Sequence, residues 1–452
     1  MNKDIKFYQL NPSQDIVLLQ QKYSLFKQVM NITTSTTCDF EVDFEVMKQA
    51  FNKVIERIDS TRLRFVKDGK TLKQYFVDEY KIDNIPRYEF KTEKEQNKFI
   101  EKECSKAIKY LKGEVIKPIF IKTYDGKSMI FVKVCHLIFD IYGISIFYKD
   151  LFAVYNALLN NEELPPAPAN FEEVLIKDLK IKNAADSQEK HKEFYYNHYK
   201  DKPEPIYAGI DAGKSKEMAK LKKKGKNYVK VYFIRNQTKG HLHIIDGELV
   251  KEVIKYCEKN DITLGNFFLY TFTLTLSKMN NDAKYLLPFE LNNSRATLKE
   301  KSCGGTKVQS INGLYTVIEQ ENNFVDGVKE LANLKNNMMK HMGLYDQNHT
   351  MLMSQLYGSP MFGLYYSLTY SFVPFFKQEN TSFDIYSNGH GALPTYIALL
   401  HDVVSQEIRV AYDCLTILTT DEDVKNFHEN MLSVTKQIIK KDNIKIGEIK
   451  VK

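Results

Sequence analysis

The chain has 452 residues, which predicts two core-forming units because single hydrophobic cores rarely grow beyond about 250–300 residues. Hydrophobic residues make up 43% and charged residues 27%, as in ordinary globular proteins, and a net charge of +7 is too dilute to indicate a nucleic-acid partner. No apolar run reaches the ~18–20 residues of a membrane span and the polar start lacks a signal-peptide core, so we expect a cytoplasmic protein without membrane association.

The first part of the chain alternates between helical and strand-like patterns. Apolar residues at helical spacing predict an amphipathic helix over 43–58 and a second helix over 95–111. Two strand-like runs around the turn-forming segment 67–70 predict a hairpin, and Asp125-Gly126 marks the turn of another hairpin within 118–139. A helix from Ile144 completes an α/β unit that ends near residue 160.

The rest of the chain repeats a comparable mixture after a proline-rich segment over 160–173. We therefore predict a first lobe over 1–165, a linker over 166–180 and a second lobe over 181–452. In the second lobe, helices are expected over 246–260, 263–279 and 420–441, the first two capped by Asp246 and Thr263.

Metal and disulfide chemistry have little support in the sequence. The six cysteines are scattered, without a Cys-x-x-Cys pair, which fits a reducing compartment. His241 and His243 alternate on an expected strand, but no third ligand is evident, so we predict no metal site.

The most informative stretch is FVKVCHLIFDIYGISIFYKDLFAVY, residues 131–155, which alternates like a strand and then repeats like a helix. His136 ends the strand pattern, on the opposite face from Cys135. A neutral imidazole in apolar surroundings can accept a proton near pH 7, because burial opposes its charging. Spacing alone still favours a core histidine bonded to a backbone carbonyl. Asp140 needs a partner if it is buried, or else it caps the helix that follows.

The segment CHLIFDI, residues 135–141, resembles the HHxxxDG motif of the condensation domains of nonribosomal peptide synthetases. These domains belong to the superfamily of chloramphenicol acetyltransferase and other acyltransferases. Further segments are similar to the family in the expected order: 8–21, which includes Gln14, then 51–65, 286–305, 386–402 and 408–432.

The resemblance implies an α/β fold of two chloramphenicol-acetyltransferase-like lobes that form a V-shaped pseudo-dimer with a central channel. It implies that His136 is the catalytic residue and assists the incoming nucleophile, either by accepting its proton or by orienting it. It also implies a structural role for Asp140, which we expect to form a bidentate ion pair with Arg295 from the other lobe. Tyr142 and His390 are further channel candidates.

The motif departs from the family at two positions. Cys135 replaces the first histidine, which should cost little; a role as nucleophile is supported only by its adjacency to His136. Ile141 replaces the glycine, and a β-branched residue does not easily adopt positive φ. We expect either a re-shaped loop, in which Gly143 supplies the freedom, or a narrower channel, which favours a small or linear acceptor or a loss of catalysis.

The resemblance uses the whole chain, so we predict a free-standing, monomeric acyltransferase of the condensation type in nonribosomal peptide or lipopeptide-type biosynthesis. It would join an acyl thioester donor to an amine and form an amide. No cofactor is expected to be bound, because the acyl group would arrive as a phosphopantetheine or coenzyme A thioester. The expected partners are an acyl or peptidyl carrier protein, or coenzyme A, and a small amine or hydroxyl acceptor. The alternatives are a coenzyme A-dependent O-acyltransferase and a non-catalytic scaffold that binds carrier proteins.

Overall fold

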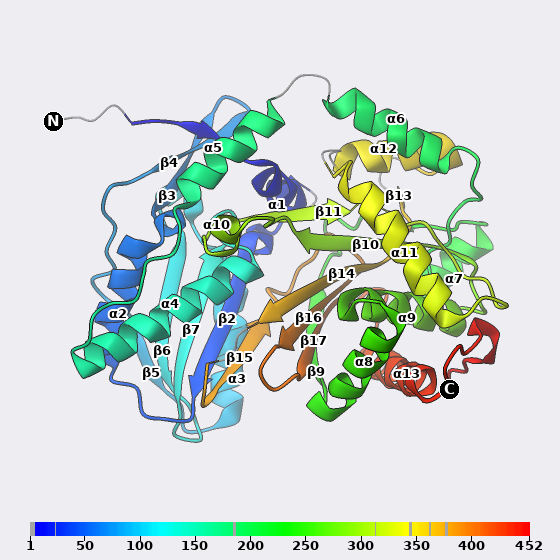
Figure 1. The fold of residues 1–452 in the computed structure, drawn as a ribbon. Helices are drawn as coiled ribbons and strands as arrows, with labels where there is room; N and C mark the ends of the chain where they lie inside the picture. Colours follow the sequence, from blue (N-terminus) through cyan, green and yellow to red (C-terminus); the bar gives the residue numbers. More distant parts are fainter. Residues whose placement is uncertain are drawn as a thin grey trace. The chain divides into compact units, whose positions relative to one another are not determined.

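A computed structural model describes residues 5–22, 24–183, 187–311, 313–342, 346–360, 363–375 and 378–452. The chain divides into two compact units (Figure 1). The first unit comprises Met1–Ala184, Asn293–Val308 and Phe375–Gly389, and the second comprises Ala185–Asn292, Gln309–Pro374 and His390–Lys452. Within the described ranges, no helix has the length and apolar character needed to cross a bilayer.

The first unit is built around a five-stranded sheet with the order β15–β2–β7–β6–β5. Only the β5–β6 pair is parallel, and the other neighbours are antiparallel. The strands are β2 (Asn31–Cys38), β5 (Arg87–Glu89), β6 (Ile116–Lys122), β7 (Ser128–Cys135) and β15 (Thr381–Tyr386). A smaller sheet has the order β1 (Tyr8–Gln9), β4 (Thr71–Phe76) and β3 (Leu63–Asp68). The helices are α1 (Pro12–Lys22), α2 (Phe44–Arg57), α3 (Glu93–Cys104), α4 (Ile141–Asn160), α5 (Phe171–Lys182) and α10 (Leu298–Lys301).

Both faces of the five-stranded sheet are covered (Figure 1). Helices α2 and α4 pack on one face, where Phe44 of α2 stacks on Phe120 of β6 with ring centroids 4.8 Å apart. Helix α3 lies on the other face, where Ile100 joins a buried cluster with Phe131 of β7. Because successive strand residues point to opposite faces, the nearly continuous apolar run of β7 suits a strand that is buried on both sides.

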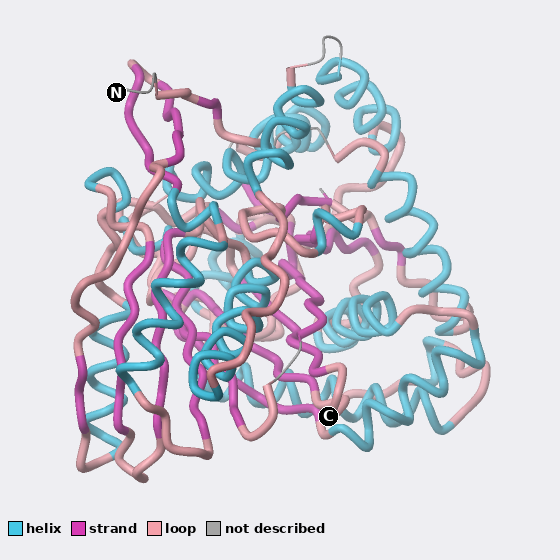
Figure 2. Tube along the Cα trace, turned by 60° about the vertical axis from the view of Figure 1, so that its left-hand side comes forward, coloured by secondary structure: helices cyan, strands magenta, loops and turns pink. Residues whose placement is uncertain are grey.

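The second unit is built around a larger sheet with the order β11–β10–β14–β16–β17–β9 and β12 paired to β10. Figure 2 draws the strands of both units in magenta. Its strands are β9 (Thr238–Ile245), β10 (Tyr285–Asn293), β11 (Val308–Ile311), β12 (Thr316–Val317), β14 (Tyr366–Phe375), β16 (Thr395–Asp402) and β17 (Ile408–Leu415), and a two-stranded sheet joins β8 (Val229–Lys230) to β13 (Gly363–Leu364). The helices are α6 (Ser187–Tyr199), α7 (Lys216–Lys223), α8 (Gly247–Asn260), α9 (Leu264–Met279), α11 (Phe324–Met339), α12 (Asp346–Tyr357) and α13 (Asp421–Lys440). Helix α9 is buried from Phe267 to Ser277 and packs against α8, α11 and α13.

The structure confirms the helices that carry strong periodicity and a cap. Asp43 accepts the N–H groups of Glu45 and Val46 at the start of α2, and Asp246 and Thr263 cap α8 and α9 as predicted. The hairpin β3–β4 and the hairpin β6–β7 are present, and the latter turns at Gly126 with φ +82°.

Two sequence-based expectations differ from the structure. The helix predicted over 95–111 ends at Cys104, because Lys133 donates to the carbonyls of Glu103 and Lys106 and Asn31 also donates to the Lys106 carbonyl, at 2.8–2.9 Å. The predicted linker over 166–180 is mostly helix α5, which belongs to the first unit. The first unit therefore runs past residue 165 and also takes two later segments of the chain.

Candidate active site

His136 lies in a tight turn between the end of β7 and the start of α4, within the first unit. Its backbone N–H donates to the Met30 carbonyl at 2.8 Å, and the Ile138 N–H donates back to the Cys135 carbonyl at 3.0 Å, so strand pairing ends and the chain turns here. The His136 side chain is half-buried. Its Nδ1 atom is enclosed and has no hydrogen-bond partner among the residues that the structure describes.

The surroundings keep the His136 imidazole neutral at pH 7. Burial lowers its pKa below the ordinary value, although the carbonyl groups of the turn and the Asp140 carboxylate oppose this effect. A neutral imidazole can accept a proton or orient a nucleophile.

Asp140 is buried at the start of α4 and serves two purposes at once. Its Oδ1 atom accepts the Gly143 N–H at 2.7 Å as the helix N-cap, and its Oδ2 atom accepts Arg295 Nη1 at 2.8 Å and the Lys307 N–H at 2.7 Å. Burial on its own raises the pKa of Asp140, but the Arg295 charge and these hydrogen bonds hold the pKa below its usual range. The carboxylate is therefore ionised at neutral pH.

The ion pair expected between Asp140 and Arg295 is present, but its geometry and location differ from the expectation. The contact is single instead of bidentate, because the second terminal nitrogen of Arg295, Nη2, donates to the Gly305 carbonyl at 2.8 Å. The Arg295 side chain is fully buried. Arg295 also groups with the first unit instead of the other lobe, since Asn293–Val308 packs with the N-terminal part of the chain.

The residues after Asp140 explain how the loop does without the motif glycine. Ile141 is the first residue of α4 and has a helical backbone, so this position requires no positive φ. Gly143 also supplies no unusual dihedral; it allows close approach, since a Cβ there would lie 2.8 Å from the Gly305 carbonyl oxygen. Tyr142 lies 4.8 Å from the Arg295 guanidinium, ring centroid to Cζ, and covers the ion pair.

The remaining sequence candidates are Cys135, His390 and the histidines of β9. Burial raises the pKa of the Cys135 thiol to about 12, which makes it a poor nucleophile at neutral pH. His390 belongs to the second unit, where its Nδ1 atom lies 3.2 Å from Asn236 Oδ1. His243 stacks on His428 with ring centroids 4.4 Å apart. Among the described residues, no three His, Cys, Asp or Glu side chains are grouped as metal ligands require.

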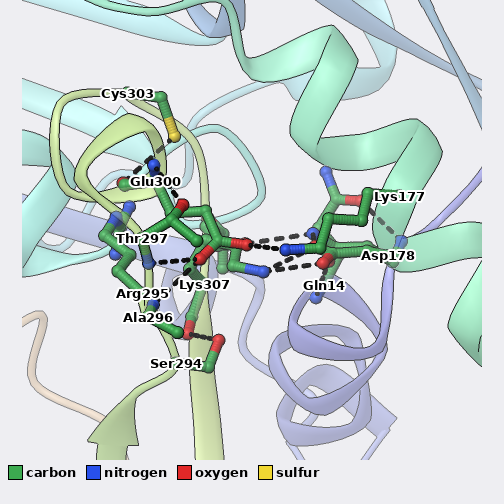
Figure 3. A network of polar contacts seen from close by, with 12 residues as sticks. Gln14, Lys177, Asp178, Ser294, Arg295, Ala296, Thr297, Glu300, Cys303 and Lys307 are labelled. Carbon is green, nitrogen blue, oxygen red and sulfur yellow. Dashed lines mark hydrogen bonds and ion pairs between the residues drawn. The ribbon is translucent and has the colours of Figure 1, made fainter.

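Sequence reasoning missed a set of polar residues that surround the histidine turn. Three residues of this network, Gln14, Lys307 and Asp178, are labelled in Figure 3. The Thr306 hydroxyl donates to the His136 carbonyl at 2.6 Å, and Gln14 Nε2 donates to the Leu137 carbonyl at 2.9 Å. Lys307 Nζ forms a buried ion pair with Asp178 of α5 at 2.7 Å. One signal for Asp178 was available, because it continues the apolar spacing of Phe171, Val174 and Leu175, and a charged residue on a buried face needs a partner.

Most of the chain matches the model of a known protein family. The family model described as Condensation domain matches residues 4–362. No curated protein sequence matches the chain.

Solved structures match over nearly the full length. A mutant starter condensation domain of rhizomide synthetase RzmA in complex with C8-CoA has a TM-score of 0.80 at 14% identity, with 99% of this chain and 98% of that chain covered. The first condensation domain of the calcium-dependent antibiotic synthetase in complex with a substrate analogue has a TM-score of 0.81 at 12% identity, with 99% of both chains covered. The condensation domain of Monacolin K polyketide synthase MokA has a TM-score of 0.79 at 10% identity, with 98% and 100% covered. This likeness confirms the fold class, a mixed α/β fold with two chloramphenicol-acetyltransferase-like lobes.

Proposed function

The chain belongs to the condensation domain family, and from this premise we propose that it is an acyltransferase that joins an acyl thioester donor to an amine acceptor and forms an amide. One observation carries the proposal. His136, at the second histidine position of the motif, is only half-buried, and its turn is braced by the buried Asp140–Arg295 ion pair.

In the proposed reaction, the acceptor nitrogen attacks the thioester carbonyl carbon. The C–N bond forms, the C–S bond breaks, and the proton that the nitrogen loses ends on the departing thiolate. The neutral His136 imidazole accepts that proton or holds the acceptor through a hydrogen bond. Holding both reactants in place supplies a large part of the rate, because it converts a bimolecular encounter into a local step.

We propose that the donor arrives on phosphopantetheine, in coenzyme A or on a carrier protein. Two solved structures of similar fold support this class of donor: one contains C8-CoA, and another contains C8-CoA and Leu-SNAC. The amine acceptor is proposed over a hydroxyl because the family match is to condensation domains. The helical backbone at Ile141 supports catalytic competence, since the replacement of the motif glycine leaves the Asp140 cap and ion pair in place.

The test is mass spectrometry of the products after the purified protein is mixed with acyl-CoA or acyl-carrier donors and a panel of amines and alcohols. The expected result is an amide product that disappears in the His136→Ala variant while circular dichroism and carrier binding stay unchanged. Ester products alone would favour an O-acyltransferase. Carrier binding without any product, in the parent and the variant alike, would favour a non-catalytic scaffold and refute the proposal.

A further inference from the structure

A second buried ion pair lies behind the histidine turn, at a place where the chemistry described above does not require a charge. Lys307 Nζ contacts both oxygens of Asp178, at 2.7 and 2.9 Å, and the two side chains are only 5% and 11% exposed. Neither residue contacts His136 directly. Both belong to the first unit, Lys307 from the segment after α10 and Asp178 from α5.

The pair, which Figure 3 shows, is connected to His136 through a series of hydrogen bonds. Asn11 Nδ2 donates to Asp178 Oδ2 at 3.3 Å and to the Thr306 carbonyl at 3.1 Å. The Thr306 hydroxyl then donates to the His136 carbonyl at 2.6 Å. Thr306 is fully buried, so its rotamer and its backbone are both set by these neighbours.

The segment that carries Thr306 is fastened on both sides. On one side, Arg295 Nη2 holds the Gly305 carbonyl at 2.8 Å. On the other side, the Lys307 N–H holds the Asp140 carboxylate at 2.7 Å and the Lys307 ammonium group is anchored on Asp178. The Lys307 side chain thus fixes the end of the segment that the Arg295 side chain does not reach.

We propose that Lys307 and Asp178 form a positioning pair for His136, which acts through Thr306 and Asn11. This inference rests on the proposed function of His136. The pair has a geometric role, because it fixes Thr306, whose hydroxyl holds the carbonyl of His136 and so the direction of its ring for the reaction.

The physical argument comes from the cost of buried charge. Replacing a buried ion pair by apolar side chains of similar volume is often neutral or stabilising, whereas removing one partner is strongly destabilising. A pair that served stability alone would therefore be replaceable. A pair that fixes a direction would not be, because methyl and methylene groups fill the same space without aiming the Thr306 hydroxyl.

The first unit offers a matched control in the Arg57–Asp150 ion pair. Arg57 of α2 and Asp150 of α4 form contacts of 2.8 and 2.9 Å, and their side chains are 11% and 6% exposed. This pair has similar burial and similar chemistry, but Arg57 donates onward to the carbonyls of Pro165 and Pro166 instead of to the histidine turn. Asp150→Asn and Asp178→Asn therefore remove the same charge from comparable environments, and only the second change touches the positioning network.

The experiment compares the parent with Asp178→Asn, Asp150→Asn and the double variant Lys307→Met/Asp178→Leu. Lys307→Met keeps the backbone N–H that binds Asp140, so the double variant removes only the side-chain pair. Three quantities are measured: the midpoint of denaturant unfolding, kcat and KM for amide formation, and the pH titration of His136. The titration follows the nuclear magnetic resonance signal of isotope-labelled histidine, assigned through its loss in His136→Ala.

The proposal predicts that the unfolding midpoint of the double variant lies at or above the denaturant concentration of the parent's midpoint. Its kcat should nevertheless fall by at least about tenfold, with KM within about twofold, because ~1 Å of misplacement can cost on the order of 10²-fold in rate. The His136 signal should shift in both Asp178 variants and not in Asp150→Asn. An unchanged His136 signal and unchanged kcat in the double variant would overturn the proposal. A different outcome is that the parent shows no turnover while the His136 signal still shifts in the Asp178 variants. The positioning role of the pair would then stand, and the function proposed for the chain would be refuted.

Discussion

Arg295→Met tests how strongly the buried ion pair supports the histidine turn. The change leaves the Asp140 carboxylate buried without its cation, and it also removes the donor to the Gly305 carbonyl. Breaking a buried pair in this way costs ~3–5 kcal/mol. Asp140 keeps two backbone donors, the N–H groups of Gly143 and Lys307, so we expect a loss of about 3 kcal/mol in the free energy of unfolding at neutral pH.

The stability difference between the parent and Arg295→Met should change with pH in a predictable direction. In the parent, the pKa of Asp140 lies below its ordinary value, so the stabilisation is present above about pH 4 and is lost as the pH falls through the lowered folded pKa. In Arg295→Met, burial is no longer offset by a cation, so the pKa of Asp140 should rise. The variant then neutralises the carboxylate in mild acid, and the stability gap between parent and variant should narrow from neutral pH to about pH 5.

The assay is denaturant unfolding at both pH values, with Arg295→Met/Asp140→Asn as the control. The asparagine keeps an acceptor for the helix cap but removes the charge, so the double variant should recover part of the lost stability. A single variant as stable as the parent at neutral pH, or a gap that widens in acid, would refute the reasoning.

Three other measurements test the remaining features of the site and the core. The rate of amide formation should fall as the pH decreases through the lowered pKa of His136, because an imidazolium cannot accept a proton. The measurement is a pH–rate profile corrected for protonation of the acceptor amine, and a rate that stays constant over this range would contradict the prediction. Burial lowers the pKa values of His349 and His428 to about 3, so only the unfolded chain binds protons there between about pH 3 and pH 6.5. The free energy of unfolding should therefore be lower at about pH 5 than at neutral pH, by about 2 kcal/mol per histidine. His349→Gln should weaken this dependence of stability on pH in denaturant titrations. Gly143→Ala would place a Cβ 2.8 Å from a facing carbonyl oxygen, so we expect a loss of about 1–3 kcal/mol in unfolding experiments; an unchanged midpoint would show that the loop can shift.

The elements that the sequence predicted well are those whose signals are local. Helices α8 and α9 combine an apolar stripe with a capping side chain, and both begin within a residue of the predicted start. The 3.6-residue and two-residue periods on either side of His136 also correctly predicted a strand followed by a helix. These features depend on neighbours within a few residues, which a single sequence contains.

The features that the sequence did not predict depend on contacts between distant segments. The end of α3 is decided by Asn31 and Lys133, far from it in the chain. The expectation of a re-shaped loop at Ile141 assumed a positive φ that the helical start of α4 does not need. Asp178 carried a readable signal, but the prolines before it favoured a linker and hid the helix. The resemblance suggested the ion pair, whereas its single contact and its Thr306 and Lys307 neighbours depend on how distant segments pack together.

The first unit is assembled from three stretches of chain that translation delivers far apart in time. Strand β15 completes the five-stranded sheet, and the stretch that carries Arg295 completes the surroundings of His136, only after most of the polypeptide has left the ribosome. A chimera that exchanges residues 1–165 between relatives would import the imidazole without the residues that brace it. Productive crossovers should instead carry 293–308 and 375–389 along with the N-terminal part.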